Sequence, residues 1–152
     1  MNQEKKKPFS KFNQSRVIAV FFLIFLPLNN LNVAYYDMLV TKTSEYLDIM
    51  MPILLLYGVF TPFVFLIIKK AMVIAYRKGK MKFKSPDHAW RKLSTMQSAV
   101  VAATFLYGFI VFTMSGDIQR MLYFYPIGAV WAFFFWPTRK RYENFISKIE
   151  EQ

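Results

Sequence analysis

The chain has no cysteine and only one histidine among its 152 residues. The lack of cysteine excludes disulfides, thiolate catalysis, covalent haem attachment and iron–sulfur ligation. The histidine, His88, follows Asp87 in the first turn of an expected helix, where an exposed imidazole is usually only a solvated side chain. Neither a His/Asp/Glu cluster with metal-ligand spacing nor a glycine-rich phosphate loop occurs. The sequence therefore predicts a protein that is not an enzyme and holds no metal or cofactor.

Charge is also missing from four long stretches. Residues 17–36, 49–68, 93–116 and 121–138 contain no Lys, Arg, Asp, Glu or His. At about 1.5 Å per helical residue, each stretch suffices to cross, or nearly cross, a hydrocarbon core of roughly 30 Å. A hydrophobic fraction of 55% is high for a soluble domain and suits a lipid-facing one. We expect an all-α integral membrane protein, with residues 1–152 forming a single domain of four transmembrane helices.

The basic residues show which way such a bundle would face. All 20 except Lys42 and Arg120 lie before the first stretch, in the connection 69–92, or after the fourth stretch. The positive-inside rule makes that side cytoplasmic, so both termini and the loop 69–92 are predicted to lie in the cytoplasm. We expect the membrane to be the inner membrane of a bacterium. An alternative for the first stretch is the apolar part of a cleaved signal peptide, which would leave the other three orientations unchanged.

The same charge distribution bears on partners. A net charge of +11 is compatible with nucleic-acid binding, but membrane orientation accounts for it without that function. Lys80, Lys82 and Lys84 alternate with Met81 and Phe83. This pattern is typical of a surface segment whose apolar side chains dip into lipid while its lysines contact headgroups. The expected partners on this face are anionic lipids and not nucleic acid.

The first span contains the main polar group within the apolar stretches. Pro27 interrupts it, and Asn29, Asn30 and Asn32 follow. Asn29 and Asn32 are three residues apart and share a helix face, which we expect to turn toward other helices, because an unpaired amide in hydrocarbon is costly. The three asparagines are therefore candidates for an intramembrane polar contact. In the alternative interpretation the span ends before them and they lie among headgroups.

Small residues recur in the last two spans. Ser94, Ser98 and Ala102 are four apart in the third span, and Gly128 and Ala132 form a similar pair in the fourth. Small side chains let helix backbones approach closely, and helix association in lipid depends on such packing. We predict tight packing between these two helices. Contact between two copies of the chain is the competing use of the same faces.

Local signals predict where several helices begin, bend and end. Asp48 is a candidate cap for the second helix, and Gly79 is expected to end it in the left-handed conformation. Pro62 removes the donor for the Gly58 carbonyl and should kink that helix, as a hinge or as plain packing geometry. Ser85 is expected to cap the third helix.

The end of the fourth span and the tail have their own signals. The fourth span is rich in aromatic residues, which we expect to face lipid, and it should end at Trp136-Pro137. The tail, residues 142–152, is expected to form a short surface helix.

These features favour interaction within the membrane over chemistry. We expect an accessory or structural subunit that binds other integral membrane proteins as part of a larger hetero-oligomeric complex. One alternative is a carrier or channel centred on the asparagines and the Pro62 kink. Another is an immunity or exclusion protein acting against a pore-forming bacteriocin or a transfer machine. In size, basic charge and four-span arrangement, the chain resembles the inner-membrane immunity proteins that protect bacteria from pore-forming colicins; the resemblance covers topology and composition and assigns no residue.

Overall fold

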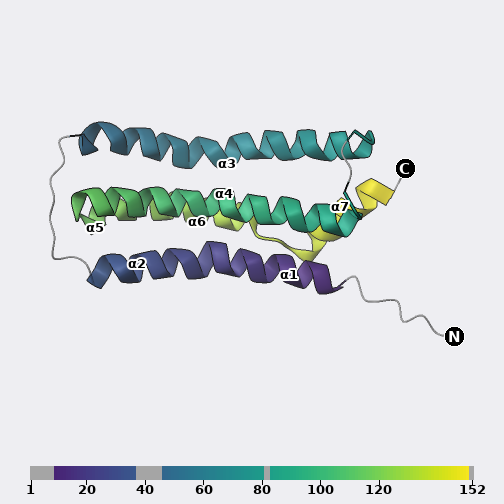
Figure 1. Ribbon diagram of the computed structural model, residues 1–152, viewed down its shortest axis with the longest axis horizontal. Helices are drawn as coiled ribbons and strands as arrows, with labels where there is room; N and C mark the ends of the chain where they lie inside the picture. The colour runs from purple at the N-terminus through teal and green to yellow at the C-terminus, as the bar shows by residue number, and fades with distance from the viewer. Residues whose placement is uncertain (1–8, 37–45, 81–82, 151–152) are drawn as a thin grey trace.

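The computed structural model describes residues 9–36, 46–80 and 83–150 of the chain. Every regular element in this part is helical, and the long helices lie side by side along one axis (Figure 1). The expected all-α fold is confirmed. In chain order the elements are α1 (Phe9–Val20), the π-helical turn η1 (Phe21–Phe25), α2 (Leu26–Tyr36), α3 (Leu47–Arg77), α4 (Pro86–Ser115), α5 (Ile118–Leu122), α6 (Phe124–Phe135) and α7 (Arg139–Glu150).

The first three elements form one continuous helix with a wider turn in its middle. In η1 the backbone N–H of Leu26 bonds the carbonyl of Phe21, five residues back. Pro27 follows directly and has no N–H to donate to the carbonyl of Leu23. The π-turn thus lies where the proline interrupts the regular hydrogen-bond ladder, a common site for such a turn.

Helix α3 has 31 residues and includes Pro62 in its interior. After its last residue the chain turns at Gly79, whose φ of 67° is the predicted left-handed conformation. The prediction that Asp48 caps α3 is wrong. The helix begins at Leu47, its N-cap residue is Tyr46, and the Tyr46 side chain makes no capping hydrogen bond. The Asp48 carboxylate instead accepts a hydrogen bond from Arg120 at 2.9 Å.

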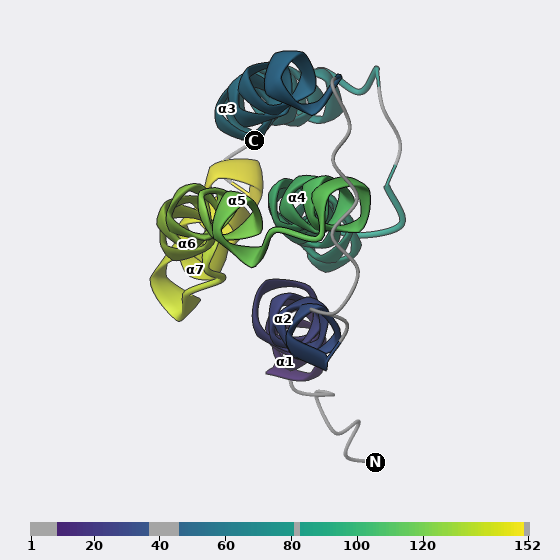
Figure 2. The same ribbon diagram turned by 90° about the vertical axis from the view of Figure 1, so that its left-hand side faces the viewer.

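Helix α4 is the centre of the bundle. It contacts all the other helical elements, and the end-on view shows it between α3 and the α1–α2 helix, with α6 beside it (Figure 2). The predicted N-cap is confirmed, since the Ser85 hydroxyl accepts from the backbone N–H of His88 at 3.2 Å and Pro86 is the first helical residue. Buried residues occur along the whole helix, from Ala89 to Ser115. The small residues of its sequence are what permit neighbours on several sides.

The segment after α4 differs from the expected single helix over residues 121–138. Helix α5 ends at Leu122, and α6 runs for only 12 residues from Phe124 to Phe135. The cause is Pro126, which has no N–H for the Leu122 carbonyl and whose ring would collide with it in a regular helix. The predicted end at Trp136-Pro137 is confirmed, since Trp136 has an extended ψ of 127°. Helix α7 then begins at Arg139, three residues before the predicted tail helix.

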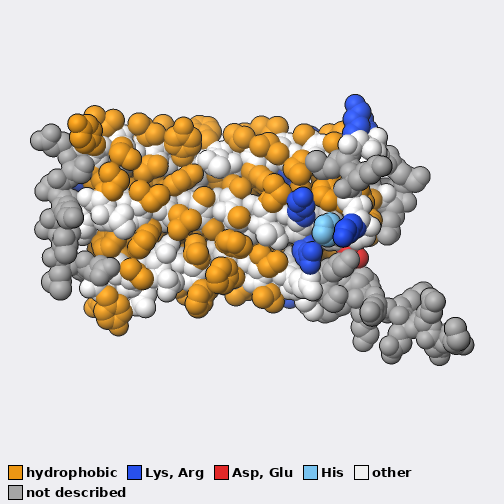
Figure 3. Space-filling model, viewed as in Figure 1, with side chains coloured by type: hydrophobic (Ala, Val, Ile, Leu, Met, Phe, Trp, Pro, Cys, Tyr) orange, Lys and Arg blue, Asp and Glu red, His pale blue; other side chains and the backbone are white. Residues whose placement is uncertain are grey.

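Three helices in the described part of the chain are long and apolar enough to cross a membrane: Phe12–Tyr36, Leu47–Arg77 and Pro86–Ser115. The surface agrees with this, because apolar side chains cover the length of the bundle (Figure 3). The Lys and Arg side chains visible in that view gather at one end, where α1 begins, α3 ends and α7 lies (Figures 1 and 3). We call this the basic end.

Candidate functional site

Trp90 joins three helices at the basic end. Its indole N–H donates to the Ser15 hydroxyl of α1 at 3.3 Å, and Ser15 in turn donates to the carbonyl of Phe12 at 2.7 Å. The ring also packs against α7, with centroid distances of 5.7 Å to Tyr142 and 5.5 Å to Phe145. These contacts hold α7 against the bundle although little of its own surface is apolar.

A cavity of about 600 Å³ opens beside Trp90, between the last turns of α3, the first half of α4, the end of α6 and α7. We call it the basic cavity. Its size is in the range of ordinary ligand sites. Much of its wall is apolar and includes Leu66, Val73, Ile74, Phe135, Trp136 and Phe145.

Five basic side chains also line this cavity, and the described residues that line it include no Asp or Glu. They come from the end of α3, in the middle of the chain, and from α7, near its C-terminus: Lys69, Lys70, Arg77, Arg141 and Lys148. No ion pair involving any of the five is found among the described residues. The cavity therefore combines an apolar wall with uncompensated positive charge.

Two of these cations are held by neutral partners. The Lys69 ammonium donates to the Gln97 side-chain oxygen at 2.6 Å and lies 5.7 Å from the centroid of the Trp90 ring. The Arg141 guanidinium donates to the carbonyls of Phe134 and Trp136, at the C-terminal end of α6. A cation there is stabilised by the free carbonyls and the negative end of the helix dipole. Neither contact neutralises the positive charge.

Sequence reasoning assigned these basic residues to membrane orientation and missed that they converge. Gln97 carried a usable signal, because it is the only glutamine in the four uncharged stretches. It lies four residues inside the third stretch, and Lys69 directly follows the second. Two antiparallel helices joined by the loop 69–92 bring those positions to a similar depth.

The predicted asparagine site divides between two environments. Asn30 is buried, 8% exposed, and its side-chain nitrogen finds no acceptor in the described part of the chain. Asn29 and Asn32 share a face as predicted, but that face is exposed and does not turn toward the other helices. Together with Phe25, Leu28, Leu31 and Tyr35 these two amides line a second, shallow groove on α2 and the turn before it.

The residues predicted to pack helices lie at helix contacts. Ser94, Ser98 and Ala102 are buried on α4, and Ala132 packs against the apolar cluster around Phe105 and Phe135. Gly128 is buried so closely that a Cβ there would lie 2.5 Å from Cζ of Phe105. These faces are occupied within one copy of the chain.

The predicted lipid-contact lysines follow α3. Lys80 and Lys84 are exposed, and Lys82 lies outside the described residues. Neither Lys80 nor Lys84 lines the basic cavity. The basic end thus carries two sets of cations, one that lines the cavity and one that does not.

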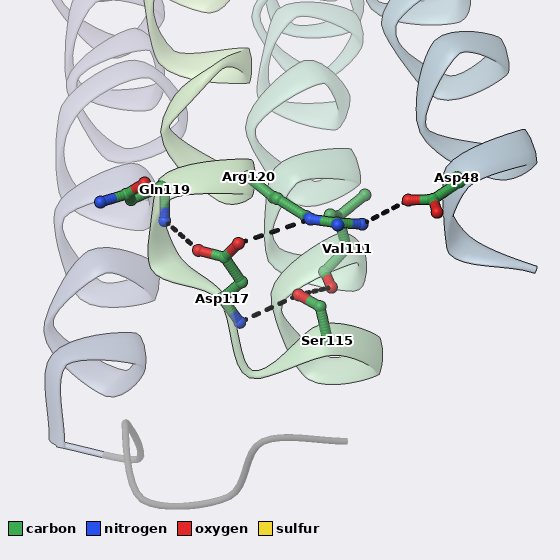
Figure 4. A network of polar contacts seen from close by, with 6 residues as sticks. All are labelled: Asp48, Val111, Ser115, Asp117, Gln119 and Arg120. Atoms are coloured by element: carbon green, nitrogen blue, oxygen red, sulfur yellow. Dashed lines mark hydrogen bonds and ion pairs between the residues drawn. The ribbon is translucent and has the colours of Figure 1, made fainter. Parts of the chain in front are cut away.

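A small polar network closes the opposite end of the bundle (Figure 4). Arg120 pairs with Asp48 of α3 at 2.9 Å and with Asp117 at 3.4 Å. Asp117 caps α5 by accepting from the backbone N–H of Gln119 at 2.8 Å, and its own N–H donates to the Ser115 hydroxyl at 3.0 Å. All these groups serve capping or pairing, so the network is structural.

The described residues include no group of three or more His, Cys, Asp or Glu side chains placed to hold a metal ion. Comparison with protein family models, with curated proteins and with solved structures finds no match for this chain. The features that bear on function are therefore the basic cavity and the exposed amides of α2.

Proposed function

We propose that this chain is a non-enzymatic, four-span protein of the bacterial inner membrane that binds another integral membrane protein through α2. The observation that carries the proposal is the exposed pair Asn29 and Asn32 on an otherwise apolar helix face. A side-chain amide in hydrocarbon without a partner costs on the order of several kcal/mol. Hydrogen bonds from a neighbouring helix remove that cost and give the contact its specificity.

The proposal of four membrane crossings depends on the arrangement of α5 and α6. Helices α5 and α6 run beside α4 from the end opposite to the basic end back toward it (Figure 1). Residues 118–135 span about 27 Å at the standard helical rise, close to a hydrocarbon core of roughly 30 Å. Both chain ends then lie on the basic side, which the positive-inside rule makes cytoplasmic.

Binding to a different protein explains this surface better than association between two copies of the chain. The small-residue faces that would serve a homodimer are already buried within one copy. The α2 groove remains open, and its amides need hydrogen bonds from polar side chains of a partner at the same depth in the membrane. We therefore propose a hetero-oligomer in which a polar helix of a larger complex occupies the α2 groove.

Site-specific photocross-linking in native membranes tests the proposal. A photoreactive phenylalanine analogue at Leu28, which lines the groove, should give one discrete cross-linked species, whereas the same analogue at Phe133, 81% exposed on α6, should not. Asn29→Leu with Asn32→Leu should abolish the species, and Asn29→Gln with Asn32→Gln should retain it. Cross-linking only to a second copy of the chain, or cross-linking insensitive to the leucine changes, would contradict the proposal.

A further inference from the structure

The basic cavity carries more positive charge than its surroundings balance. Lys69, Lys70, Arg77, Arg141 and Lys148 line it, and none of the carboxylates in the described part of the chain does. Lys69 is half-buried, so its ammonium has lost part of its water, and among the described residues it gains the Gln97 oxygen and the Trp90 ring in return. Collecting like charges around a partly apolar space is unfavourable unless an anion joins them.

Membrane orientation alone does not require this convergence. Lys78, Lys84 and Lys140 are at the same end, are exposed, and do not line the cavity. They satisfy the positive-inside rule equally well without lining the cavity. The cations that line the cavity come from α3 and α7, which are distant in sequence and brought together by the Trp90 contacts with Tyr142 and Phe145.

The apolar wall of the cavity favours an anion that also carries a hydrocarbon chain. Leu66 and Phe135 lie where α3 and α6 leave their apolar stretches, and Trp136 and Phe145 continue the apolar wall toward α7. Tryptophan is favoured at the membrane interface, where one part of the ring meets lipid and the other meets headgroups. A ligand in this position meets cations at the basic end and aromatic side chains toward the spans.

We propose that the basic cavity is a binding site for the phosphate of an anionic membrane phospholipid, with the start of an acyl chain against its apolar wall. Lysine and arginine are the standard ligands of phosphate, through charge-assisted hydrogen bonds. The volume of about 600 Å³ accommodates a headgroup and the first carbons of a chain. The site lies on α3, α4, α6 and α7, so it does not depend on the contact proposed for α2.

Tryptophan fluorescence reports on this site in a Trp131→Phe background, because Trp90 and Trp136 line it and Trp131 does not. The full chain is reconstituted in phosphatidylcholine vesicles. In one set of vesicles the added lipid is brominated phosphatidic acid, and in the other it is brominated phosphatidylcholine. The quenching of tryptophan fluorescence by each brominated lipid gives their relative affinities. The variant Lys70→Gln with Lys148→Gln removes two exposed cavity cations. The control, Lys78→Gln with Lys140→Gln, removes the same charge from exposed positions outside the cavity.

The unmodified chain should prefer phosphatidic acid roughly tenfold, the cavity variant should lose most of that preference, and the control should keep it within about twofold. Equal loss in both variants would overturn the site in favour of diffuse surface charge, and no loss in either would overturn it outright.

Inorganic phosphate at millimolar concentration should not relieve the quenching. Relief by inorganic phosphate would show that the cavity takes free phosphate and that the apolar wall contributes nothing, which overturns the lipid assignment. Arg77→Gln with Lys148→Gln is a second cavity variant, and it should agree with the first.

Discussion

The hydroxyl of Thr104 on α4 donates to the carbonyl of Gly58 on α3 at 3.3 Å. That carbonyl has no donor in its own helix, because the residue four positions later is Pro62. A Cβ on Gly58 would lie 3.1 Å from Cγ2 of Thr104, so the glycine is what lets the hydroxyl approach. The proline that interrupts α3 and the threonine that compensates for it thus link the two longest helices at mid-bundle.

Thr104→Val should therefore destabilise the bundle. Valine keeps the shape of threonine but leaves a buried carbonyl without a donor, which we expect to cost about 1 kcal/mol of unfolding free energy. Unfolding in a denaturing detergent, followed by circular dichroism, measures the change. Thr113→Val is the matched control, because the Thr113 hydroxyl bonds the carbonyl of Ile110 in its own helix and is exposed. Equal effects of the two changes would refute the interhelical role of Thr104.

Gly128→Ala should also be destabilising, for a steric reason. The added methyl would lie 2.5 Å from Cζ of the buried Phe105 ring, which itself packs against Tyr125 with a centroid distance of 5.3 Å. Overpacking of this kind costs about 1–3 kcal/mol.

A double-mutant cycle separates that clash from other effects of the substitution. Leucine at 105 has no atom at the position of Cζ, so Phe105→Leu should reduce the cost of Gly128→Ala. Strictly additive effects of the two changes on unfolding free energy would argue against close contact at this site.

Local rules accounted for much of the fold. The cap at Ser85, the left-handed Gly79 and the end of α6 at Trp136-Pro137 each depend on a few neighbouring residues, and each is confirmed. Pro126 obeys the same rules, and its effect was overlooked because uncharged length, rather than helix continuity, defined the fourth stretch. The assignment of Asp48 as a cap failed because a long-range donor, Arg120, competes for the carboxylate.

The candidate sites were harder to predict because they depend on which helices become neighbours. The cations of the basic cavity lie in two segments about seventy residues apart, and only the packing of α7 on Trp90 brings them to one place. The face of α2 posed the opposite problem. We expected Asn29 and Asn32 to be buried because they are polar groups in an apolar span. Helix α4, with its small residues, packs against other positions of α2 and leaves both asparagines exposed. Spacing defined the face correctly and could not say which neighbour covers it.

The number of crossings can be measured with single cysteines, because the chain has none of its own. Lys84→Cys, Gln119→Cys and Lys140→Cys each place a thiol at an exposed position. With four spans, a membrane-impermeant maleimide added to spheroplasts should label only Gln119→Cys. The other two should react only after the membrane is opened.

If α5 and α6 do not cross, Lys140→Cys should be labelled together with Gln119→Cys while Lys84→Cys stays protected. The Lys140→Cys result therefore separates four crossings from three, whichever way the bundle is inserted, because it depends only on which of the other two positions shares its side.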